Sequence, residues 1–275
     1  MAAPSRLLAL PGALALRAVW QYRGFVSGMV RREFRARYLQ SLFGSTWALL
    51  TPAAMIAIYT VIFAQVMRAR LPGVDDTFAY SIYLCAGILP WIYLTEVLTR
   101  SLTVFIDNAT LLKKVSFPRI TLPVILLLGS TVNFAIIFSI FLLVLAAVGR
   151  FPGAVVLAMV PLLVIQQAFA IGGGVLLGVL NVFFRDVAQM VGVVVQFWFW
   201  LTPIVYSTVI LSDGARGVLA WNPMTKLVGA YQRILLTGTS PAWSEFRWHA
   251  LGALVLVVAA FVAFDRLSGE MIDEL

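Results

Sequence analysis

The chain has 275 residues, of which 61% are hydrophobic and only 12% are charged. A soluble domain carries about a quarter charged residues, so this composition excludes one. The net charge is +8, but the basic residues flank long apolar runs, which indicates membrane topology and argues against nucleic-acid binding. Cys85 is the single cysteine, which excludes an intrachain disulfide and a cysteine-based metal site.

The N-terminal segment contains an apolar stretch at residues 7–16 that imitates a signal peptide. A block of arginines follows it and resists translocation, so we expect residues 1–46 to stay in the cytoplasm. Val30, Phe34 and Tyr38 recur at every fourth position, which predicts an amphipathic helix on the cytoplasmic membrane surface. The alternative is a topological stop signal with no separate role.

Six uncharged apolar runs meet or approach the roughly 20 residues that a helix needs to cross a bilayer. They occupy residues 47–67, 77–95, 120–149, 151–184, 187–212 and 248–264. The sequence therefore predicts an all-α polytopic membrane protein with six transmembrane helices.

The distribution of lysine and arginine predicts the orientation of these spans. Most of these residues fall in the segments 1–46, 100–119, 185–186 and 265–275. Basic segments stay in the cytoplasm, so both termini are expected there.

Residues 213–247 contain apolar stretches broken by Lys226 and Arg233, none long enough to span a bilayer. The turn at Trp221-Asn222-Pro223 divides them. We favour a pair of short helices that re-enter the outer leaflet. The alternative is a long outer loop.

The segment 107–119 mixes charged with apolar residues between the second and third predicted spans. This pattern predicts a short amphipathic cytoplasmic helix that docks into a groove of another protein, although a solvated loop is the alternative. Pro118 stops any helix at that point.

Chemistry-bearing motifs are scarce. Gly172-Gly173-Gly174 lacks the Gly-Lys-Ser/Thr of a phosphate-binding loop, so we interpret it as a site of close helix packing. Glu96 is the single ionisable residue among the intramembrane polar residues, and it is interpreted as structural or interfacial more readily than as a proton relay. We therefore expect the energy for any transport to come from outside the chain.

Aromatic residues gather at 197–200, with Tyr206 and Trp91 elsewhere. They form either an interfacial belt or a lining on which sugar rings stack. Trp198 and Tyr206 are expected on one helix face, provided that Pro203 bends the helix only modestly.

Several further motifs occur in chain order. They are Arg32-Glu33-Phe34-Arg35-Ala36-Arg37-Tyr38 with Ser41, Gly44, Trp47 and Pro52, Leu111-Leu112-Lys113-Lys114 with Phe117-Pro118-Arg119, Phe184-Arg185-Asp186-Val187, Thr202-Pro203-Ile204-Val205-Tyr206, and Trp221-Asn222-Pro223 followed by Tyr231-Gln232-Arg233 and Gly238. Together they resemble the motifs of the ABC-2 type permeases that export O-antigen, capsular polysaccharide and teichoic acid. Glu33 stands where Asp is common in that family, and Thr202 where Ser is common.

The resemblance implies a homodimer in the bacterial inner membrane, bound to two ATPase subunits that hold ATP and magnesium, so that this chain binds no cofactor itself. The implied domains are a tail and interfacial helix (1–46), a transmembrane domain (47–266) with an outer gate near 213–244, and a cytoplasmic C-terminal tail (267–275). Lipid-linked polysaccharide and membrane lipids are the implied ligands.

The resemblance also assigns residues to two roles, and the aromatic pattern to a third. Coupling to the ATPase falls to Asn108, Leu111, Lys113, Lys114, Phe117, Arg185 and Asp186. The cytoplasmic gate helix presents Arg31, Arg32, Arg35, Arg37 and Tyr38. The channel lining proposed from the aromatic pattern comprises Trp198, Tyr206, Phe197 and Trp91.

Three rival interpretations remain beside this one. The first is an ABC-2 permease for a drug or small lipid. The second is an ion-coupled carrier or channel, which the lack of ionisable residues in the spans disfavours. The third is a membrane-embedded glycosyl or lipid transferase, which the lack of clustered acidic or histidine residues disfavours.

Overall fold

The computed structural model describes residues 20–38, 47–62, 78–114 and 117–275, and these contain helices and no strands. The early apolar stretch (7–16), residues 39–46 of the predicted tail and interfacial helix, and residues 63–67 of the first predicted span lie outside them. The α-helices are α2 (Arg23–Tyr38), α3 (Trp47–Thr60), α4 (Ala79–Asp107), α5 (Ala109–Lys114), α6 (Thr121–Ala147), α7 (Met159–Phe183), α8 (Asp186–Trp200), α9 (Asp213–Ala220), α10 (Pro223–Thr237), α11 (Arg247–Leu267) and α12 (Glu270–Glu274).

Four helical stretches in the described part of the chain are long and apolar enough to cross a membrane. They are Ala79–Asp107, Thr121–Ala147, Gly153–Phe183 and Trp243–Leu267. Over the described residues α3 has 14 residues and α8 has 15, which is short for a span. The structure thus supports an all-α polytopic protein, and the count of six spans stays a prediction.

Two predicted boundaries are wrong. The second span does not end near residue 95, because α4 continues past Arg100 to Asp107. Arg100 does not stop the helix, because arginine is a good helix former. Glu33 and Glu96 lie beside its charge. The fifth apolar run is not one helix, because α8 ends at Trp200, shortly before Pro203. Proline has no N–H to donate and disfavours a helical residue before it, which breaks the helix.

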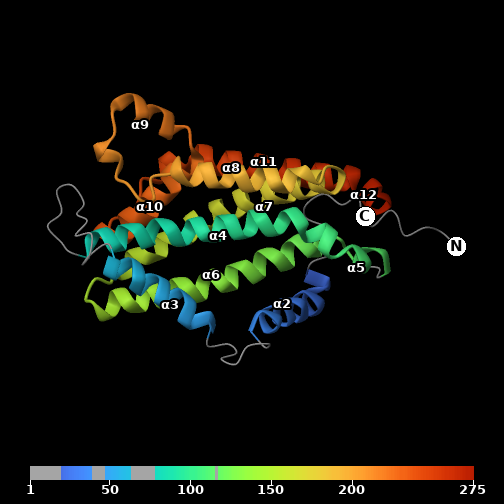
Figure 1. Ribbon diagram of the computed structural model, residues 1–275, viewed down its shortest axis with the longest axis horizontal. Coiled ribbons are helices and arrows are strands. Elements are labelled where there is room, and N and C mark those ends of the chain that lie inside the picture. Colours follow the sequence, from blue (N-terminus) through green and yellow to red (C-terminus); the bar gives the residue numbers. More distant parts are fainter. Residues whose placement is uncertain (1–19, 39–46, 63–77, 115–116) are drawn as a thin grey trace.

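The long helices run side by side along the longest axis of the molecule (Figure 1). α5 and α12 lie together at one end, called the α5 end below, and α9 and α10 lie at the opposite end, called the α10 end. The two short helices predicted within 213–247 are present as α9 and α10. Their re-entry into a membrane remains a prediction.

α7 lies between α4 and α11 and touches both closely. A methyl group added at Gly172 would lie 2.7 Å from the backbone nitrogen of Val257 in α11. One added at Gly178 would collide with the carbonyl oxygen of Ser101 in α4, and Gly174 faces the same serine. The prediction that the glycine run permits close helix packing is confirmed, as small residues commonly do between membrane helices.

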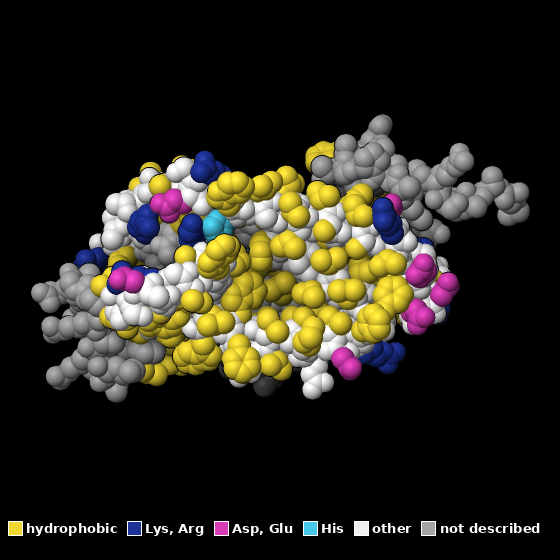
Figure 2. Space-filling model, turned by 90° about the horizontal axis from the view of Figure 1, so that it is seen from above, with side chains coloured by type: hydrophobic (Ala, Val, Ile, Leu, Met, Phe, Trp, Pro, Cys, Tyr) yellow, Lys and Arg dark blue, Asp and Glu magenta, His cyan; other side chains and the backbone are white. Residues whose placement is uncertain are grey.

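The surface divides into an apolar middle and polar ends. Figure 2 shows hydrophobic side chains over the centre of one face, with lysine, arginine, aspartate and glutamate gathered toward the two ends. Exposed apolar residues on α11 include Leu254, Val255 and Val258. An exposed apolar surface of this extent fits contact with lipid.

Candidate functional site

The α5 end begins where α4 stops. α4 ends at Asp107, and Asn108 donates from Nδ2 to the carbonyl oxygen of Val104 at 2.8 Å. This bond satisfies one of the carbonyls that a helix leaves free at its C-terminus. α5 follows with six residues, a length at which an isolated helix is unstable in water.

α5 has an apolar and a charged side. Leu111 and Leu112 pack against the core, whereas Lys113 and Lys114 are exposed. Phe117, just after the helix, packs against Phe25 of α2 with ring centroids 5.5 Å apart. None of the residues of α5 is fully buried, so its position depends on the elements around it.

The C-terminal helix α12 is one of those elements. Met271 of α12 is buried, and Leu112 of α5 lines the same junction, where the remaining void is only about 10 Å³. Arg119 donates to the carbonyl oxygen of Ser268 at 2.5 Å. Partial burial lowers the pKa of Arg119, yet an arginine remains protonated in proteins. The sequence predicts a cytoplasmic tail over 267–275, and no pattern in it indicates the contact with α5.

The turn between α7 and α8 lies at the same end and carries Arg185 and Asp186, both exposed. Asn181 fixes the turn. Its Nδ2 donates to the carbonyl oxygen of Leu102 in α4 at 2.9 Å, and its Oδ1 accepts from the backbone N–H of Ala188 at 3.0 Å. The residues predicted to couple to an ATPase are thus brought to one end by α4, α5 and α7. Their docking role stays a prediction.

The predicted gate helix is present as α2. Arg31, Arg32 and Arg35 are exposed, as expected for arginines that face headgroups. Arg37 and Tyr38 belong to α2, but their side chains lie outside the described part of the structure.

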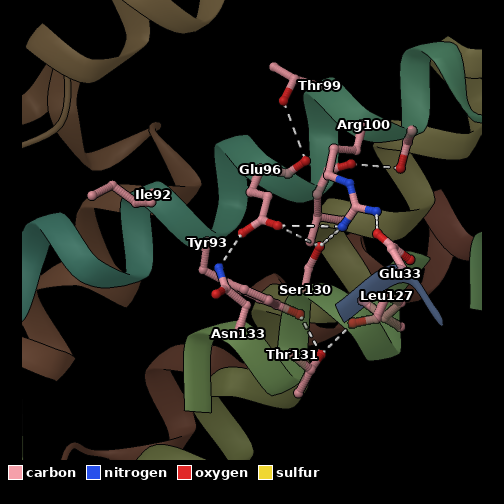
Figure 3. A network of polar contacts seen from close by, with 12 residues as sticks. Glu33, Ile92, Tyr93, Glu96, Thr99, Arg100, Leu127, Ser130, Thr131 and Asn133 are labelled. Atoms are coloured by element: carbon pink, nitrogen blue, oxygen red, sulfur yellow. Dashed lines mark hydrogen bonds and ion pairs between the residues drawn. The ribbon is translucent and has the colours of Figure 1, made fainter. Parts of the chain in front are cut away.

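A polar network connects α2 with α4 and α6 (Figure 3). Arg100 pairs with Glu33 of α2 and also donates to the hydroxyl of Ser130 at 2.9 Å. Glu96 lies 3.4 Å from Arg100 and accepts from Asn133 at 3.1 Å. Glu96 is therefore part of a structural network. No pattern in the sequence indicates that Glu33 reaches this network.

A cleft of about 400 Å³ opens beside this network, between α2, α4 and α6. Arg32, Glu33, Arg100 and Asp107 contribute its charged lining, and the rest of the lining is largely apolar. Gly129 of α6 permits the close approach of α2, because an added methyl group would lie 3.3 Å from a carboxylate oxygen of Glu33.

At the α10 end, side chains satisfy the backbone that follows the break in α8. The hydroxyl of Tyr83 lies 3.1 Å from the carbonyl oxygen of Pro203 and 2.8 Å from that of Tyr206. The amide of Gln232 donates to the carbonyl oxygen of Pro203 at 3.2 Å. Non-helical backbone within a membrane needs such partners, because lipid offers none.

Asn222 joins the end of α8 to the start of α10. Its Nδ2 donates to the carbonyl oxygen of Leu201 at 2.8 Å and to the hydroxyl of Thr202 at 3.0 Å. Its Oδ1 accepts from the indole of Trp198 at 2.8 Å and from the backbone N–H of Met224 at 3.0 Å. The last bond makes Asn222 the N-cap of α10.

The four aromatic residues predicted to line a channel do not form one group. Trp91 is buried and meets Trp198 edge to face, with ring centroids 5.5 Å apart. Phe197 is 67% exposed. Tyr206 lies beyond the break in α8 and donates to the carbonyl oxygen of Trp200 at 2.9 Å. The expectation that Trp198 and Tyr206 share one helix face is wrong, since α8 does not continue through Pro203.

Comparison of the sequence with known proteins identifies the family of the chain. The pattern of the family described as ABC-2 type transporter matches residues 26–236, most of the chain. The chain belongs to the ABC-2 type transporter family. The matched residues run from α2 into α10, so they include the polar network, α5 and the turn at Arg185.

Individual ABC-2 relatives align over most of their length. The O-antigen export system permease protein RfbA of Myxococcus xanthus is 30% identical over 94% of this chain and 98% of its own. Two proteins of the same name from Klebsiella pneumoniae also align. One is 28% identical over 87% of this chain and 90% of its own length. The other is 27% identical over 77% of this chain and 80% of its own length.

The ABC-2 match ends before α11 and α12, so it does not include the helix that supports α5. The polar residues that the sequence analysis missed carried a weak signal. Arg100 and Asn181 are polar residues within or beside apolar runs, and such residues usually have a partner on a neighbouring helix. Nothing in a single sequence identifies that partner.

Proposed function

We propose that the chain is the permease subunit of an ATP-driven exporter that moves a lipid-linked polysaccharide out of the cytoplasm across the bacterial inner membrane. The observation that supports this most is the similarity to O-antigen export permeases along nearly the whole chain. Two copies of the chain would form the transmembrane path, with two separate ATPase subunits binding ATP and magnesium.

In this proposal the α5 end faces the cytoplasm and receives the ATPase. Its exposed lysines and the exposed turn at Arg185 fit a docking surface, and α12 lies beside them. Because α12 lies at this end, residues 267–275 would also be cytoplasmic. A reporter fused to residue 275 tests this orientation. A signal from outside the cytoplasm would show that the α5 end faces the opposite side.

The coupling role is tested by Lys113→Glu/Lys114→Glu. Reversing the two exposed charges should uncouple ATP hydrolysis from export while the permease remains folded and inserted. Lys113→Arg/Lys114→Arg is the matched control and should export normally. Co-purified ATPase, its hydrolysis rate and surface polysaccharide are the measurements. Normal export by the glutamate variant would mean that α5 is merely solvated.

The substrate is tested in a deletion strain. Loss of surface polysaccharide with accumulation of lipid-linked glycan in the cytoplasm would support the proposal. An unchanged glycan together with sensitivity to a drug would favour an ABC-2 permease for small molecules instead.

The stacking role of the aromatic residues is a separate part of the proposal. Sugar stacking contributes on the order of 1 kcal/mol per ring by analogy with other aromatic contacts, enough to guide a chain without fixing its register. Trp198→Ala/Tyr206→Ala should reduce export, whereas Trp248→Ala, at an exposed aromatic residue of α11, should not. Full export by the double variant would leave these aromatics with an anchoring role.

A further inference from the structure

A second cleft, of about 350 Å³, lies at the α10 end, between α10, the start of α4, the backbone after α8 and the 3₁₀ turn Trp243–Phe246. It is separate from the cleft beside Arg100 and from the α5 end. We call it the α10 cleft. It contains the two residues, Lys226 and Arg233, that interrupt the apolar stretches of this region.

Lys226 and Arg233 lie two turns apart on α10 and therefore on one face of that helix. Neither side chain forms an ion pair or hydrogen bond with another described residue of the chain. Glu245 is the acidic residue among the lining residues, and it pairs with neither. The α10 cleft thus has an excess of unneutralised positive charge. Both side chains are exposed, so a ligand that enters the cleft can reach them from solvent.

Hydroxyl groups stand beside the two cations. Ser207, Thr208 and Thr225 line the cleft, and Thr225 Oγ1 is buried without a hydrogen-bond partner among the described residues. Phosphate oxygens accept hydrogen bonds from this combination of ammonium, guanidinium and hydroxyl groups. Leu236 and Phe246 add apolar lining, which suits a ligand whose polar head is attached to a hydrocarbon.

Gly229 lies between the two cations along α10 and lines the same cleft. Apart from its own helix, no heavy atom of the described residues lies within 4 Å of the position that a side chain would take there. The absence of a side chain leaves the approach to the cations open. A neutral sugar would fill the space but would leave both charges uncompensated.

We propose that the α10 cleft binds the phosphate group of a lipid headgroup. In the orientation of the proposed function, on which this role rests, the cleft lies on the side that the exported lipid reaches. There it would hold the lipid phosphate after the carrier has crossed. The binding itself requires no transport and is testable on the isolated permease.

Native mass spectrometry of the purified full chain measures the binding. Dioleoyl phosphatidic acid is the phosphate probe, and dioleoylglycerol is the same lipid without phosphate. The wild type should retain phosphatidic acid preferentially. Lys226→Gln and Arg233→Gln should each lower that retention about fivefold, the effect expected for one basic residue at a lipid surface.

Two further variants separate charge from folding. Gly229→Leu fills the cleft without removing a charge and should also reduce retention. Arg216→Gln removes a basic residue of α9 that already pairs with Asp213 and should leave retention unchanged. The exchange Lys226→Arg/Arg233→Lys keeps both charges and should preserve it.

Equal retention by Lys226→Gln/Arg233→Gln and wild type would overturn the site. Displacement of phosphatidic acid by inorganic phosphate at low millimolar concentration would show a free-phosphate site and overturn the assignment to lipid. If retention depends on both cations but a strain lacking the permease displays normal polysaccharide, the proposed function fails and the site stands.

Discussion

At the α10 end, the side chains of Tyr83, Gln232 and Asn222 donate hydrogen bonds to backbone carbonyl oxygens of the segment that follows α8. At the α5 end, α5 and α12 meet through apolar side chains such as Leu112 and Met271, with the bond from Arg119 to Ser268 beside them. One end is held mainly by directional hydrogen bonds, and the other mainly by the packing of short helices.

The proposed function, which places the break after α8 within the membrane and α5 at its surface, accounts for this difference. A helix broken inside a membrane leaves carbonyls that lipid cannot satisfy, so side chains must supply the partners. A short helix at a membrane surface has water for its free groups and needs only an apolar contact. We therefore expect substitutions at the α10 end to lower stability, and those at the α5 end to affect coupling.

The largest loss of stability is expected for Asn222→Ala. It removes an N-cap and leaves Leu201, Thr202 and Trp198 without their partner, so the free energy of unfolding should fall by about 2–3 kcal/mol. Asn222→Asp keeps the acceptor for Trp198 and Met224 and should lose about half as much. Unfolding in mixed detergent micelles measures both. If Asn222→Ala left the free energy of unfolding unchanged, this end would not be held by polar bonds.

A smaller loss is expected for Tyr83→Phe. Removing the hydroxyl leaves the carbonyl oxygens of Pro203 and Tyr206 less well satisfied, at about 1 kcal/mol. Tyr231→Phe is the matched control, because the hydroxyl of Tyr231 is buried without a partner among the described residues. That control should be neutral or stabilising in the same assay. Equal losses in the two variants would point to ring packing and away from hydrogen bonding.

At the α5 end, Arg119→Gln should lower global stability by less than about 1 kcal/mol, since a bond at a partly exposed surface contributes little. Hydrogen exchange should show loss of protection in α12 and none in α10. Arg266→Gln, which removes an exposed arginine from the last turn of α11, serves as the control. Deprotection that spreads to α10 would show that the two ends are not independent.

The smallest effect on stability is expected for Arg185→Ala, within about 0.5 kcal/mol, because the side chain is exposed and away from the helix contacts. Export per ATP hydrolysed should nevertheless fall if the turn contacts the ATPase. Unchanged export would confine coupling to α5.

Asn181→Ala, which detaches the same turn from α4, should lower both stability and export.

The sequence predicts where the helices lie better than it predicts which residues of different helices contact one another. Apolar runs reveal the long helices because membrane burial requires length and hydrophobicity, and Gly172-Gly173-Gly174 reveals close packing because only small residues allow it. The pairing of Glu33 with Arg100, and of Arg119 with Ser268, joins segments far apart in the chain, and one sequence holds no record of that proximity. Pro203 signalled a break, but whether a proline bends or ends a helix depends on whether neighbours such as Tyr83 and Gln232 satisfy the backbone.

The contacts of Gly172 and Gly178 have a mechanical consequence. Where backbone meets backbone, no flexible side chain remains to absorb a small displacement by changing its rotamer. At these crossings α4, α7 and α11 are therefore expected to move together as one rigid unit. If the turn at Arg185 is displaced, we expect these three helices to move together and to carry the displacement toward the α10 end.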